Sequence, residues 1–313
     1  MNNLSAVQLE ENVDKDISEV TVSVIIATYR RDVSLRRALE SVVQQTYKNI
    51  EIIVVDDNAE ANWNKKVKDI IDDIYIQQPT IYIQNETNKG SAETRNIGIN
   101  IASGEYITFL DDDDVYLPDK VKRQIEHMII NNSDYCVTDL DLYDENEKII
   151  EKRTRSYIRE NKKNELLRYH FMYHITGTDS LMFKSSYLIR IGGFPPINLG
   201  DEFYLMQKAI EAGGQFSYLP VCDIKAYVHI ETDGLSSGES KIDGENNLHL
   251  HKKGHFEKFS LKEQRYINMR HYAVLSFAYL RQKKWLRFFM NSFLSLVNSP
   301  FQCLRLFYSR VIR

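Results

Sequence analysis

The sequence predicts an α/β protein with a mostly parallel central sheet flanked by helices, followed by a C-terminal helical region. Three observations support this prediction. From residue 21 to about residue 110, short runs of β-branched residues alternate with amphipathic stretches, which is the pattern of β-α-β units. Several of the strand-like runs end in polar residues. From residue 260 onward the apolar residues follow a helical period instead.

The predicted strands of the first half are short and apolar, as buried parallel strands are. They are TVSVIIAT (21–28), IEIIVVDD (50–57), IYIQ (81–84) and EYITFL (105–110). Helices are predicted between them. SLRRALESVVQ has an apolar stripe made of Leu35, Ala38, Leu39, Val42 and Val43. SAETRNIGINIA (91–102) is the second such helix.

The second half is less regular. YCVTDLDLY (135–143) and TGTDSLMFK (176–184) are predicted strands, as are the shorter QFSYLP and DIKAYVH. Between these pairs, GDEFYLMQKAIEAGG is predicted to be a helix that ends at its glycines.

Composition narrows the class of protein. The 313 residues are 43% hydrophobic and 27% charged, as in a folded soluble protein, and the net charge of −4 does not favour a nucleic-acid partner. Cys136, Cys222 and Cys303 are widely spaced, so neither a disulfide framework nor a zinc site is indicated, and a reducing, cytoplasmic setting is expected. We find no signal peptide and no convincing transmembrane segment.

Polar residues follow three of the predicted strands, at Thr28 to Arg31, at Asp56-Asp57 and at Asp111 to Asp114. The carboxyl ends of parallel strands meet at one edge of a sheet, where ligands bind. Aspartate is also common in turns and at helix N-caps, so a purely structural role for each stretch alone remains an alternative.

The four adjacent aspartates, 111 to 114, predict a metal site. Two carboxylates about 4 Å apart repel by roughly 1 kcal/mol in water, and a divalent cation reverses the sign of that energy. Carboxylate oxygens suit Mg²⁺ or Mn²⁺, with phosphate oxygens completing the coordination. The sequence contains neither a Walker A loop nor G-x-G-x-x-G, so the common nucleoside-triphosphatase and dinucleotide sites are not indicated.

Four separated stretches resemble the family 2 glycosyltransferases, which have the Rossmann-like GT-A fold. They are VSVIIATYRR, IIVVDDN, NKGSAETRNIGINIASGEYITFLDDDD and GDEFYLMQKAIEAGG, within about residues 20–235. The resemblance implies inverting, metal-dependent transfer of a hexosyl or N-acetylhexosaminyl group. The donor would be a nucleotide-diphosphate sugar, expected to be UDP-linked, and the acceptor a hydroxyl of a surface glycan or a lipid-linked glycan.

The resemblance also implies roles for individual residues. Those expected to bind the nucleotide are Thr28, Tyr29, Arg31, Asp57, Arg95, Asp111 and Asp112. The expected metal ligands, for Mn²⁺ or Mg²⁺, are Asp113, Asp111 and His229. A packing role for Tyr29 and a solvated helix position for Arg95 remain alternatives. For Asp114, capping of a helix that begins near Pro118 is an alternative role.

The catalytic base is expected at the start of GDEFYLMQKAIEAGG. Family members carry a Glu-Asp pair there, with leucine three positions after the aspartate. In this chain Leu205 lies three positions after Glu202, so Glu202 has the base position and Asp201 precedes it, in inverted order. Asp201 remains an alternative base, and the preference of acids for helix N-termini remains the structural explanation.

The division of the chain is predicted from these patterns. We expect a tail over residues 1–20, a GT-A catalytic domain over 21–235, a mobile loop or lid over 236–260, and a basic amphipathic helical region over 261–313. The histidines of HLHKKGH (249–255) lack the cysteines or placed carboxylate of a zinc site, so a solvated lid is favoured there.

The last 33 residues, 281–313, contain seven lysines and arginines and no acid. Two apolar faces are predicted among them: Leu286, Phe289, Phe293, Leu296 and Val297, then Phe301, Leu304, Tyr308 and Val311. A basic amphipathic helix of this kind indicates contact with a membrane surface, and packing on the catalytic domain or on a second subunit is the alternative. We therefore expect a cytoplasmic protein, peripheral on the inner face of a bacterial membrane, in surface-polysaccharide synthesis.

Two other functions fit parts of the pattern. A nucleotidyltransferase of sugar activation would need a glycine-rich loop after the first strand, and ATYRRDVS has no glycine. A non-catalytic glycan-binding relative would not need the D-x-D aspartates together with the Asp201-Glu202 pair.

Overall fold

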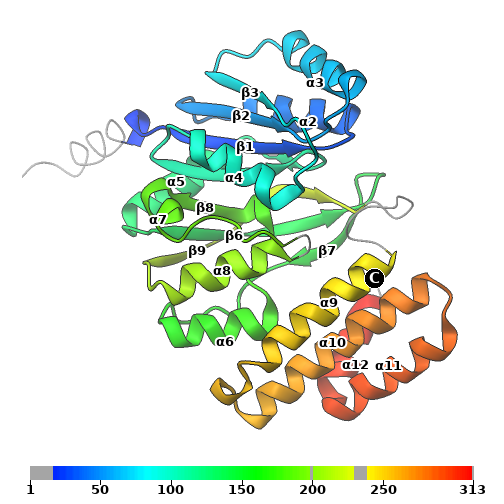
Figure 1. The fold of residues 1–313 in the computed structure, drawn as a ribbon. Helices are drawn as coiled ribbons and strands as arrows, with labels where there is room; N and C mark the ends of the chain where they lie inside the picture. Colours follow the sequence, from blue (N-terminus) through cyan, green and yellow to red (C-terminus); the bar gives the residue numbers. More distant parts are fainter. Residues whose placement is uncertain (1–16, 198–199, 229–237, 312–313) are drawn as a thin grey trace, which may run out of the picture. The chain divides into compact units, whose positions relative to one another are not determined.

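The structure, a computed structural model, describes residues 17–197, 200–228 and 238–311. It divides into two compact units. The first, here called the sheet unit, comprises the described residues up to 163 together with 175–196 and 201–228. The second, the helical unit, comprises the described residues of 164–174, 197–200 and 229–313. Figure 1 labels the elements of both units.

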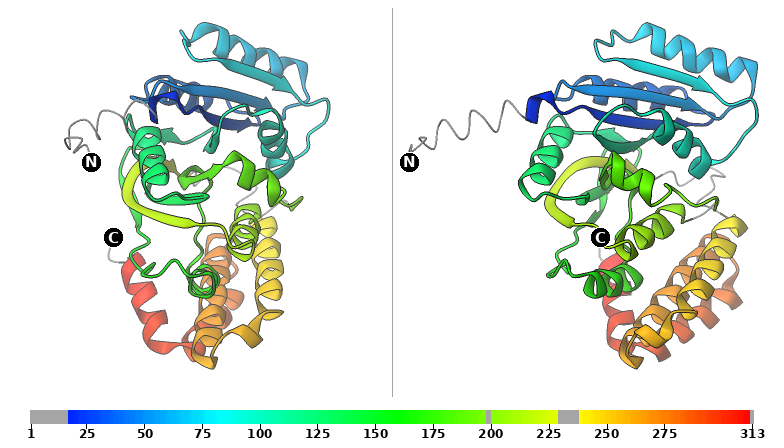
Figure 2. Two further views of the ribbon diagram at one scale, coloured as in Figure 1. Left: turned by 90° about the vertical axis from the view of Figure 1, so that its left-hand side faces the viewer. Right: turned by 60° about the vertical axis from the view of Figure 1, so that its left-hand side comes forward.

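The sheet unit contains one mixed sheet in the strand order β3-β2-β1-β4-β8-β6-β9-β5, with β7 paired to β6. The strands are β1 (Val22–Thr28), β2 (Ile50–Asp56), β3 (Thr80–Gln84), β4 (Tyr106–Asp111), β5 (Val115–Tyr116), β6 (Tyr135–Tyr143), β7 (Ile149–Arg153), β8 (Leu181–Lys184) and β9 (Phe216–Tyr227). The first four in spatial order are mutually parallel, while β8 is antiparallel to both of its neighbours. Figure 2 shows the twist of this sheet from two further sides. The predicted α/β fold is confirmed.

The helices of the sheet unit are α2 (Val33–Val43), α3 (Ala61–Asp73), α4 (Ser91–Ile101), α5 (Lys120–Ile130), α7 (Ser185–Arg190) and α8 (Asp201–Glu211), with a 3₁₀ turn, η1 (Thr178–Ser180). The helical unit holds α9 (Gly238–Lys253), η2 (Phe256–Lys258), α10 (Leu261–Arg281), α11 (Trp285–Asn298) and α12 (Pro300–Val311). It also contains nearly all of α6 (Lys163–Tyr173).

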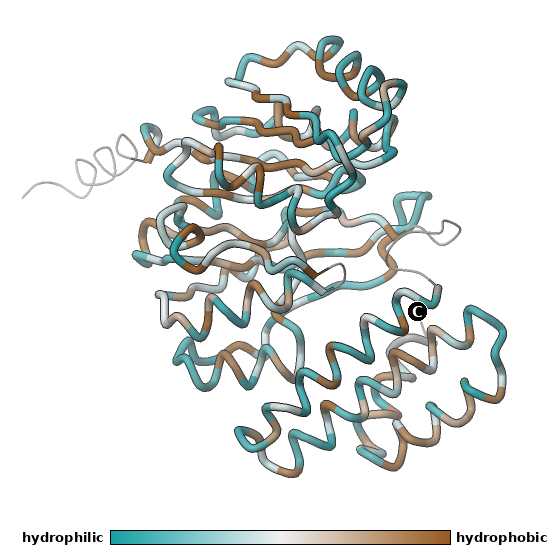
Figure 3. Tube along the Cα trace, viewed as in Figure 1, coloured by the Kyte–Doolittle hydropathy of each residue, from teal (hydrophilic) through white to brown (hydrophobic). Residues whose placement is uncertain are grey.

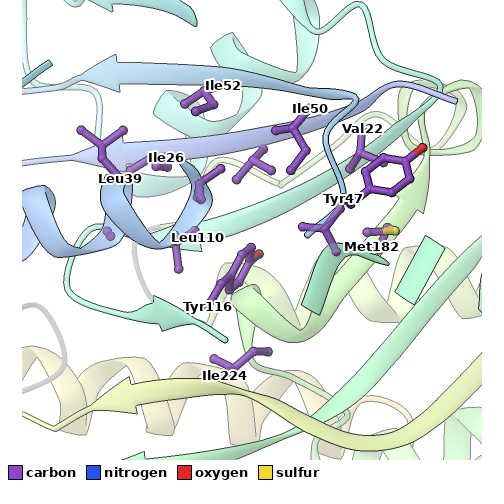
Figure 4. Close-up of a cluster of buried hydrophobic side chains, with 14 of the residues drawn as sticks. Val22, Ile26, Leu39, Tyr47, Ile50, Ile52, Leu110, Tyr116, Met182 and Ile224 are labelled. Carbon is purple, nitrogen blue, oxygen red and sulfur yellow. The ribbon is translucent and has the colours of Figure 1, made fainter. Parts of the chain in front are cut away.

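Alternation along β1 places helices on both faces of the sheet. Val22, Val24 and Ile26 belong to a core cluster with the apolar faces of α2, α3 and α5, part of which is drawn in Figure 4. Ile25 points to the opposite face, where it meets α4. A Cβ on Gly98 of α4 would lie 2.6 Å from Cγ2 of Ile25, so only glycine allows this close approach of helix and strand.

The helical unit differs from prediction in one segment. Residues 238–253, expected to be part of a mobile lid, form helix α9. Ile242 of α9 is buried against Leu275, Ala278 and Tyr279 of α10, and this tertiary contact stabilises a helix whose apolar residues show little periodicity. The expectation of a loop was therefore wrong for these residues. No described helix is long and apolar enough to span a bilayer.

Candidate active site

The carboxyl ends of β1, β2 and β4 lie at one edge of the sheet, as predicted. In the parallel register Thr28 is level with Asp56, and Ala27 is level with Asp111. The three strands end nearly level because they pair in parallel register, and each continues into a loop that carries polar residues. Thr28 is buried at the end of β1, while the next side chain, Tyr29, is partly exposed.

Asp57 holds the loop that precedes α4. Its carboxylate accepts hydrogen bonds from the Asn85 side chain and the Lys89 backbone, both at 2.8 Å, and from the Gly90 backbone at 2.9 Å. Gly90 has φ +80°, a conformation that favours glycine. Asp57 thus fixes the start of α4, and the expected hydrogen bond to a nucleotide base would use its remaining acceptor capacity.

Arg95 of α4 joins two elements that are far apart in the sequence. One of its guanidinium nitrogens lies 2.5 Å from Oδ1 of Asp111 at the end of β4, and the other lies 3.2 Å from Oδ2 of Asp201 at the start of α8. The guanidinium also lies over the ring of Phe194, 5.4 Å from its centroid. Burial lowers the pKa of Arg95, but the two carboxylates outweigh it and raise the pKa. The alternative of a solvated Arg95 is wrong, because this side chain is buried between two acids.

The acids at the start of α8 differ in their surroundings. Asp201 is buried and paired with Arg95. Glu202 is half-buried, and its burial, with the adjacent Asp201 carboxylate, raises the pKa of Glu202. A carboxyl group with a raised pKa is a stronger base once it has lost its proton, so this arrangement suits general-base chemistry near neutral pH.

Arg31 lies beside the other two aspartates of the D-x-D stretch. Its guanidinium lies 2.9 Å from Oδ2 of Asp113 and 3.7 Å from Oδ1 of Asp112. Asp112 also accepts a hydrogen bond from the backbone N–H of Tyr29 at 3.0 Å. Burial and the neighbouring Asp113 raise the pKa of Asp112. The residues expected to bind nucleotide and metal therefore contact one another across β1 and β4.

A group of three carboxylates could hold a metal ion. One oxygen each of Asp111, Asp114 and Asp179 lies within 4.8 Å of the others, and this is the sole such group of His, Cys, Asp and Glu within the described ranges. Carboxylate oxygens are ligands that suit Mg²⁺ and Mn²⁺. Burial and mutual repulsion raise the pKa values of Asp114 and Asp179, a cost that a bound divalent cation would reverse.

This group differs in part from the expected ligands. Asp111 belongs to it, Asp113 is paired with Arg31 instead, and His229 lies outside the described residues. The alternative capping role of Asp114 was wrong: α5 begins at Lys120 after Asp119. Asp114 instead accepts a hydrogen bond from the backbone of Tyr227 at 2.8 Å.

Sequence reasoning missed two residues here. Asp179 accepts a hydrogen bond from the backbone N–H of Asp111 at 2.7 Å, yet it lies near the beginning of a predicted strand, and the carboxyl-end pattern does not point to that position. Lys120 is buried with its ammonium 2.6 Å from the Thr108 hydroxyl and 2.8 Å from that of Tyr116. Burial lowers the pKa of Lys120 to about 7, although the nearby Asp179 opposes the shift. A buried lysine on an amphipathic helix gives no sequence signal of its own.

Comparisons with known proteins agree on the family. Residues 23–188 match the model of glycosyl transferase family 2. An uncharacterized glycosyltransferase of Methanocaldococcus jannaschii is 35% identical over 181 residues, which are 56% of this chain and 60% of that protein. The Escherichia coli UDP-Glc:alpha-D-GlcNAc-diphosphoundecaprenol beta-1,3-glucosyltransferase WfaP is 43% identical over 110 residues, 34% of this chain and 41% of the enzyme. The chain thus spans at most about 60% of the length of these curated relatives.

Solved structures show the same fold at low identity. S. aureus TarS 1-349 in complex with UDP-GlcNAc has a TM-score of 0.58 at 17% identity and covers 90% of this chain and 91% of its own. The mannosyltransferase PcManGT from Pyrobaculum calidifontis, in complex with GDP-Man and Mn²⁺, has a TM-score of 0.54 at 15% identity and covers 89% and 73%.

Proposed function

Since this chain belongs to glycosyl transferase family 2 and is a glycosyltransferase, we propose that it moves a hexosyl or N-acetylhexosaminyl group from a UDP-sugar to a hydroxyl of an undecaprenyl-diphosphate-linked glycan, with inversion. The activity for which the E. coli relative is named supports the donor and the acceptor. The TarS complex supports a UDP-sugar in a protein of this fold. Family membership also disfavours the nucleotidyltransferase alternative.

The Arg95 bridge is the observation that carries the proposal. It ties the aspartates after β4, expected at the diphosphate, to the acids that open α8, expected at the acceptor. A transferase needs these two groups in one site, because the bond to the donor breaks while the bond to the acceptor forms. Asp111 and Asp201 come from distant segments, yet a single buried guanidinium holds both.

Glu202 is the base we propose, and Asp201 is its positioning neighbour. Asp201 is held by Arg95, whereas the pKa of Glu202 is raised. Glu202 accepts the proton of the acceptor hydroxyl, and the hydroxyl oxygen forms a bond to the anomeric carbon. The bond from that carbon to the diphosphate breaks on the opposite face, so the anomeric configuration inverts in a single displacement.

The leaving diphosphate requires positive charge. Asp111, Asp114 and Asp179 have the donor atoms to hold Mn²⁺ or Mg²⁺, and Asp113 is the further ligand that the D-x-D pattern suggests. When bound, the ion would stabilise the charge that develops on the diphosphate. Arg31 and the partly exposed Tyr29 lie beside these acids, where they would contact the nucleotide.

Glu202→Gln tests the assignment of the base. Transfer from a UDP-sugar to a synthetic undecaprenyl-diphosphate-linked acceptor should fall by about 10²–10⁴-fold, while UDP binding with Mn²⁺ is kept. Glu211→Gln, at the other end of the same helix, is the matched control and should leave transfer unchanged. NMR of the product should show the inverted anomeric configuration. Full activity of Glu202→Gln, or retention of configuration, would overturn the mechanism.

A further inference from the structure

Helix α11 packs against its neighbours with a largely polar side, to which Phe288 adds a partly buried ring. The two buried side chains of this helix are Asn291 and Ser295, which are 4% and 0% exposed. Most of its large apolar side chains, from Trp285 to Val297, are exposed. Burial of apolar surface is the main driving force of folding. A helix with no partner outside its own chain would therefore be expected to bury its apolar side and expose its polar side. Figure 3 colours these residues by hydropathy.

Hydrogen bonds hold α11 in this orientation. The Ser295 hydroxyl donates to the backbone carbonyl of Met269 on α10 at 2.9 Å. The hydroxyls of Ser276 and Ser292 lie 2.6 Å apart between the same two helices. Rotating α11 to bury its apolar side would leave these groups without partners in an apolar contact, which is costly. The apolar side of α11 therefore faces outward because specific hydrogen bonds to α10 hold the polar side against that helix.

Helix α12 also exposes large apolar side chains. Cys303 is buried, whereas Phe301, Leu304 and Tyr308 are exposed. We call the exposed side chains of α11 and α12 the apolar face; they are between 38% and 84% exposed and comprise Trp285, Leu286, Phe289, Met290, Phe293, Leu296, Val297, Phe301, Leu304 and Tyr308. Half of these ten side chains are aromatic, and so many exposed large apolar residues on two successive helices differ from the scattered single ones that are normal on a soluble protein.

Positive charge is concentrated in the same stretch of chain as the apolar face. Residues 281–313 carry seven lysines and arginines and no acid, in a chain whose net charge is −4. Arg281, Lys283, Arg287 and Arg305 are exposed. Lys284 pairs with Glu239 of α9, which removes one positive charge from the group. Apolar and cationic side chains in one stretch of chain match a partner that is apolar and also anionic.

We propose that the apolar face docks in the surface of an anionic lipid bilayer, with α11 and α12 lying in the plane of the interface. A bilayer offers hydrocarbon for the ring and leucine side chains and anionic headgroups for the arginines and lysines. A second copy of the chain is a poorer occupant, because a two-fold contact would place these basic residues against one another. The helices do not span the bilayer, since no described helix is long and apolar enough.

Docking of this kind does not depend on the transfer reaction. The benefit of docking, however, rests on the proposed function. An enzyme held at the membrane searches only the membrane surface for an acceptor that is carried on a membrane lipid. The experiment below contains no donor, acceptor or metal. A failure of docking and a failure of the proposed transferase activity can therefore be told apart.

Co-sedimentation of the full chain with vesicles tests the proposal. The wild type should bind equimolar phosphatidylcholine and phosphatidylglycerol vesicles more tightly than phosphatidylcholine alone, and salt should weaken the binding. The triple variant Leu286→Ser, Phe289→Ser, Phe293→Ser should bind at least about tenfold more weakly. The matched control is Tyr75→Ser, Ile130→Ser, Ile189→Ser, which removes three exposed apolar side chains of the sheet unit and should bind as the wild type does.

A second variant and a spectroscopic measurement separate the sources of affinity. Arg281→Glu, Lys283→Glu, Arg305→Glu should lose the preference for the anionic vesicles. The chain has two tryptophans, so Trp63→Phe leaves Trp285 on the apolar face as the sole indole, and its emission should shift to the blue with vesicles. Circular dichroism of each variant checks that it is folded.

Three results would overturn the proposal. They are absence of wild-type binding to either vesicle, equal binding by the serine variant, and a wild-type dimer in sedimentation that the serine variant abolishes and vesicles do not displace.

Discussion

Helices α2 and α11 are both strongly amphipathic, yet they present opposite sides to their neighbours. Helix α2 buries Leu35, Ala38, Leu39 and Val42 against the sheet. Helix α11 buries Asn291 and Ser295 and exposes most of its large apolar residues. The difference teaches that periodicity identifies which residues share a face of a helix, whereas the neighbouring element decides which face is turned inward.

The two units also bury charge in different ways. In the sheet unit, acids accumulate at the end of β4, and Arg95 balances two of them. In the helical unit, the rings of His249 and His271 stack 3.8 Å apart, and neither ring nitrogen of His249 has a hydrogen-bond partner. The stability of the sheet unit is therefore expected to fall when the Arg95 guanidinium is removed. The stability of the helical unit is expected to fall when His249 gains a proton.

Removal of the buried cation should have the largest effect. Arg95→Met leaves Asp111 and Asp201 without their shared partner, so we expect a loss of about 3–5 kcal/mol in the free energy of unfolding. Urea denaturation measures this loss. Arg36→Met, which breaks an exposed pair with Asp73, is the control and should change it by less than about 0.5 kcal/mol. Arg95→Lys should restore part of the stability; a loss below about 1 kcal/mol in Arg95→Met would contradict the bridge.

The contrast between α2 and α11 is tested by one substitution in each. Leu39 is 0% exposed and Leu286 is 84% exposed. Leu39→Ala should lower the free energy of unfolding by about 2–5 kcal/mol, whereas Leu286→Ala should change it by less than about 0.5 kcal/mol. Denaturant midpoints in lipid-free buffer give both values. Equal losses at the two positions would mean that α11 buries its apolar side in solution.

The stability of the two units should respond to pH with opposite sign. The raised pKa of Asp179 means that the folded chain binds more protons there than the unfolded chain does. Stability is thus lost as pH rises from about 4 toward neutral, by on the order of 1–3 kcal/mol. Burial and then His271 lower the pKa of His249 to about 3, so the unfolded chain binds the proton first. That stability is lost as pH falls below about 6.5.

The contributions of Asp179 and His249 to stability are measured as differences in melting temperature between the wild type and a variant at each position, over a range of pH. Relative to the wild type, Asp179→Asn should gain stability at pH above neutral and His249→Phe should gain it in acid. Mn²⁺ should raise the melting temperature of the wild type in the alkaline range and have little effect on Asp179→Asn. If both variants shifted in the same direction with pH, the assigned protonation states would be wrong.

A smaller effect is expected at the contact between α10 and α11. Ser295→Ala removes the donor to the Met269 carbonyl and should lower the free energy of unfolding by about 1 kcal/mol. Ser299→Ala, at the exit of the same helix, is the control, since no side-chain hydrogen bond of Ser299 orients α11. An unchanged stability in Ser295→Ala would show that the polar contact does not hold α11 in its orientation.

Much of the site was predictable because many of its residues directly follow the carboxyl ends of parallel strands. Thr28, Asp57 and Asp111 could be assigned to one edge as soon as the strands were judged parallel, and the register confirms their position. Asp179 could not be found in this way, since β8 runs antiparallel to β4 and brings the beginning of its own segment to that edge. Strand direction is set by pairing across the sheet, and local sequence does not contain it.

The sequence by itself determined the family, most of the elements and most of the acids from which the site is built, because β-branched runs, apolar stripes and motif spacing are local properties of the chain. Tertiary structure decided which of those acids meet. Arg95 became a bridge only when Asp111, at the end of β4, and Asp201, at the start of α8, both came within reach of its guanidinium, and α9 became a helix through contacts with α10. It also decided that α11 turns its apolar side outward, since the hydroxyls that oppose rotation lie on two helices. The physical reason is the same in each case: the free energy of burying a charge, a hydroxyl or an apolar side chain depends on its partner, and the partner comes from elsewhere in the chain.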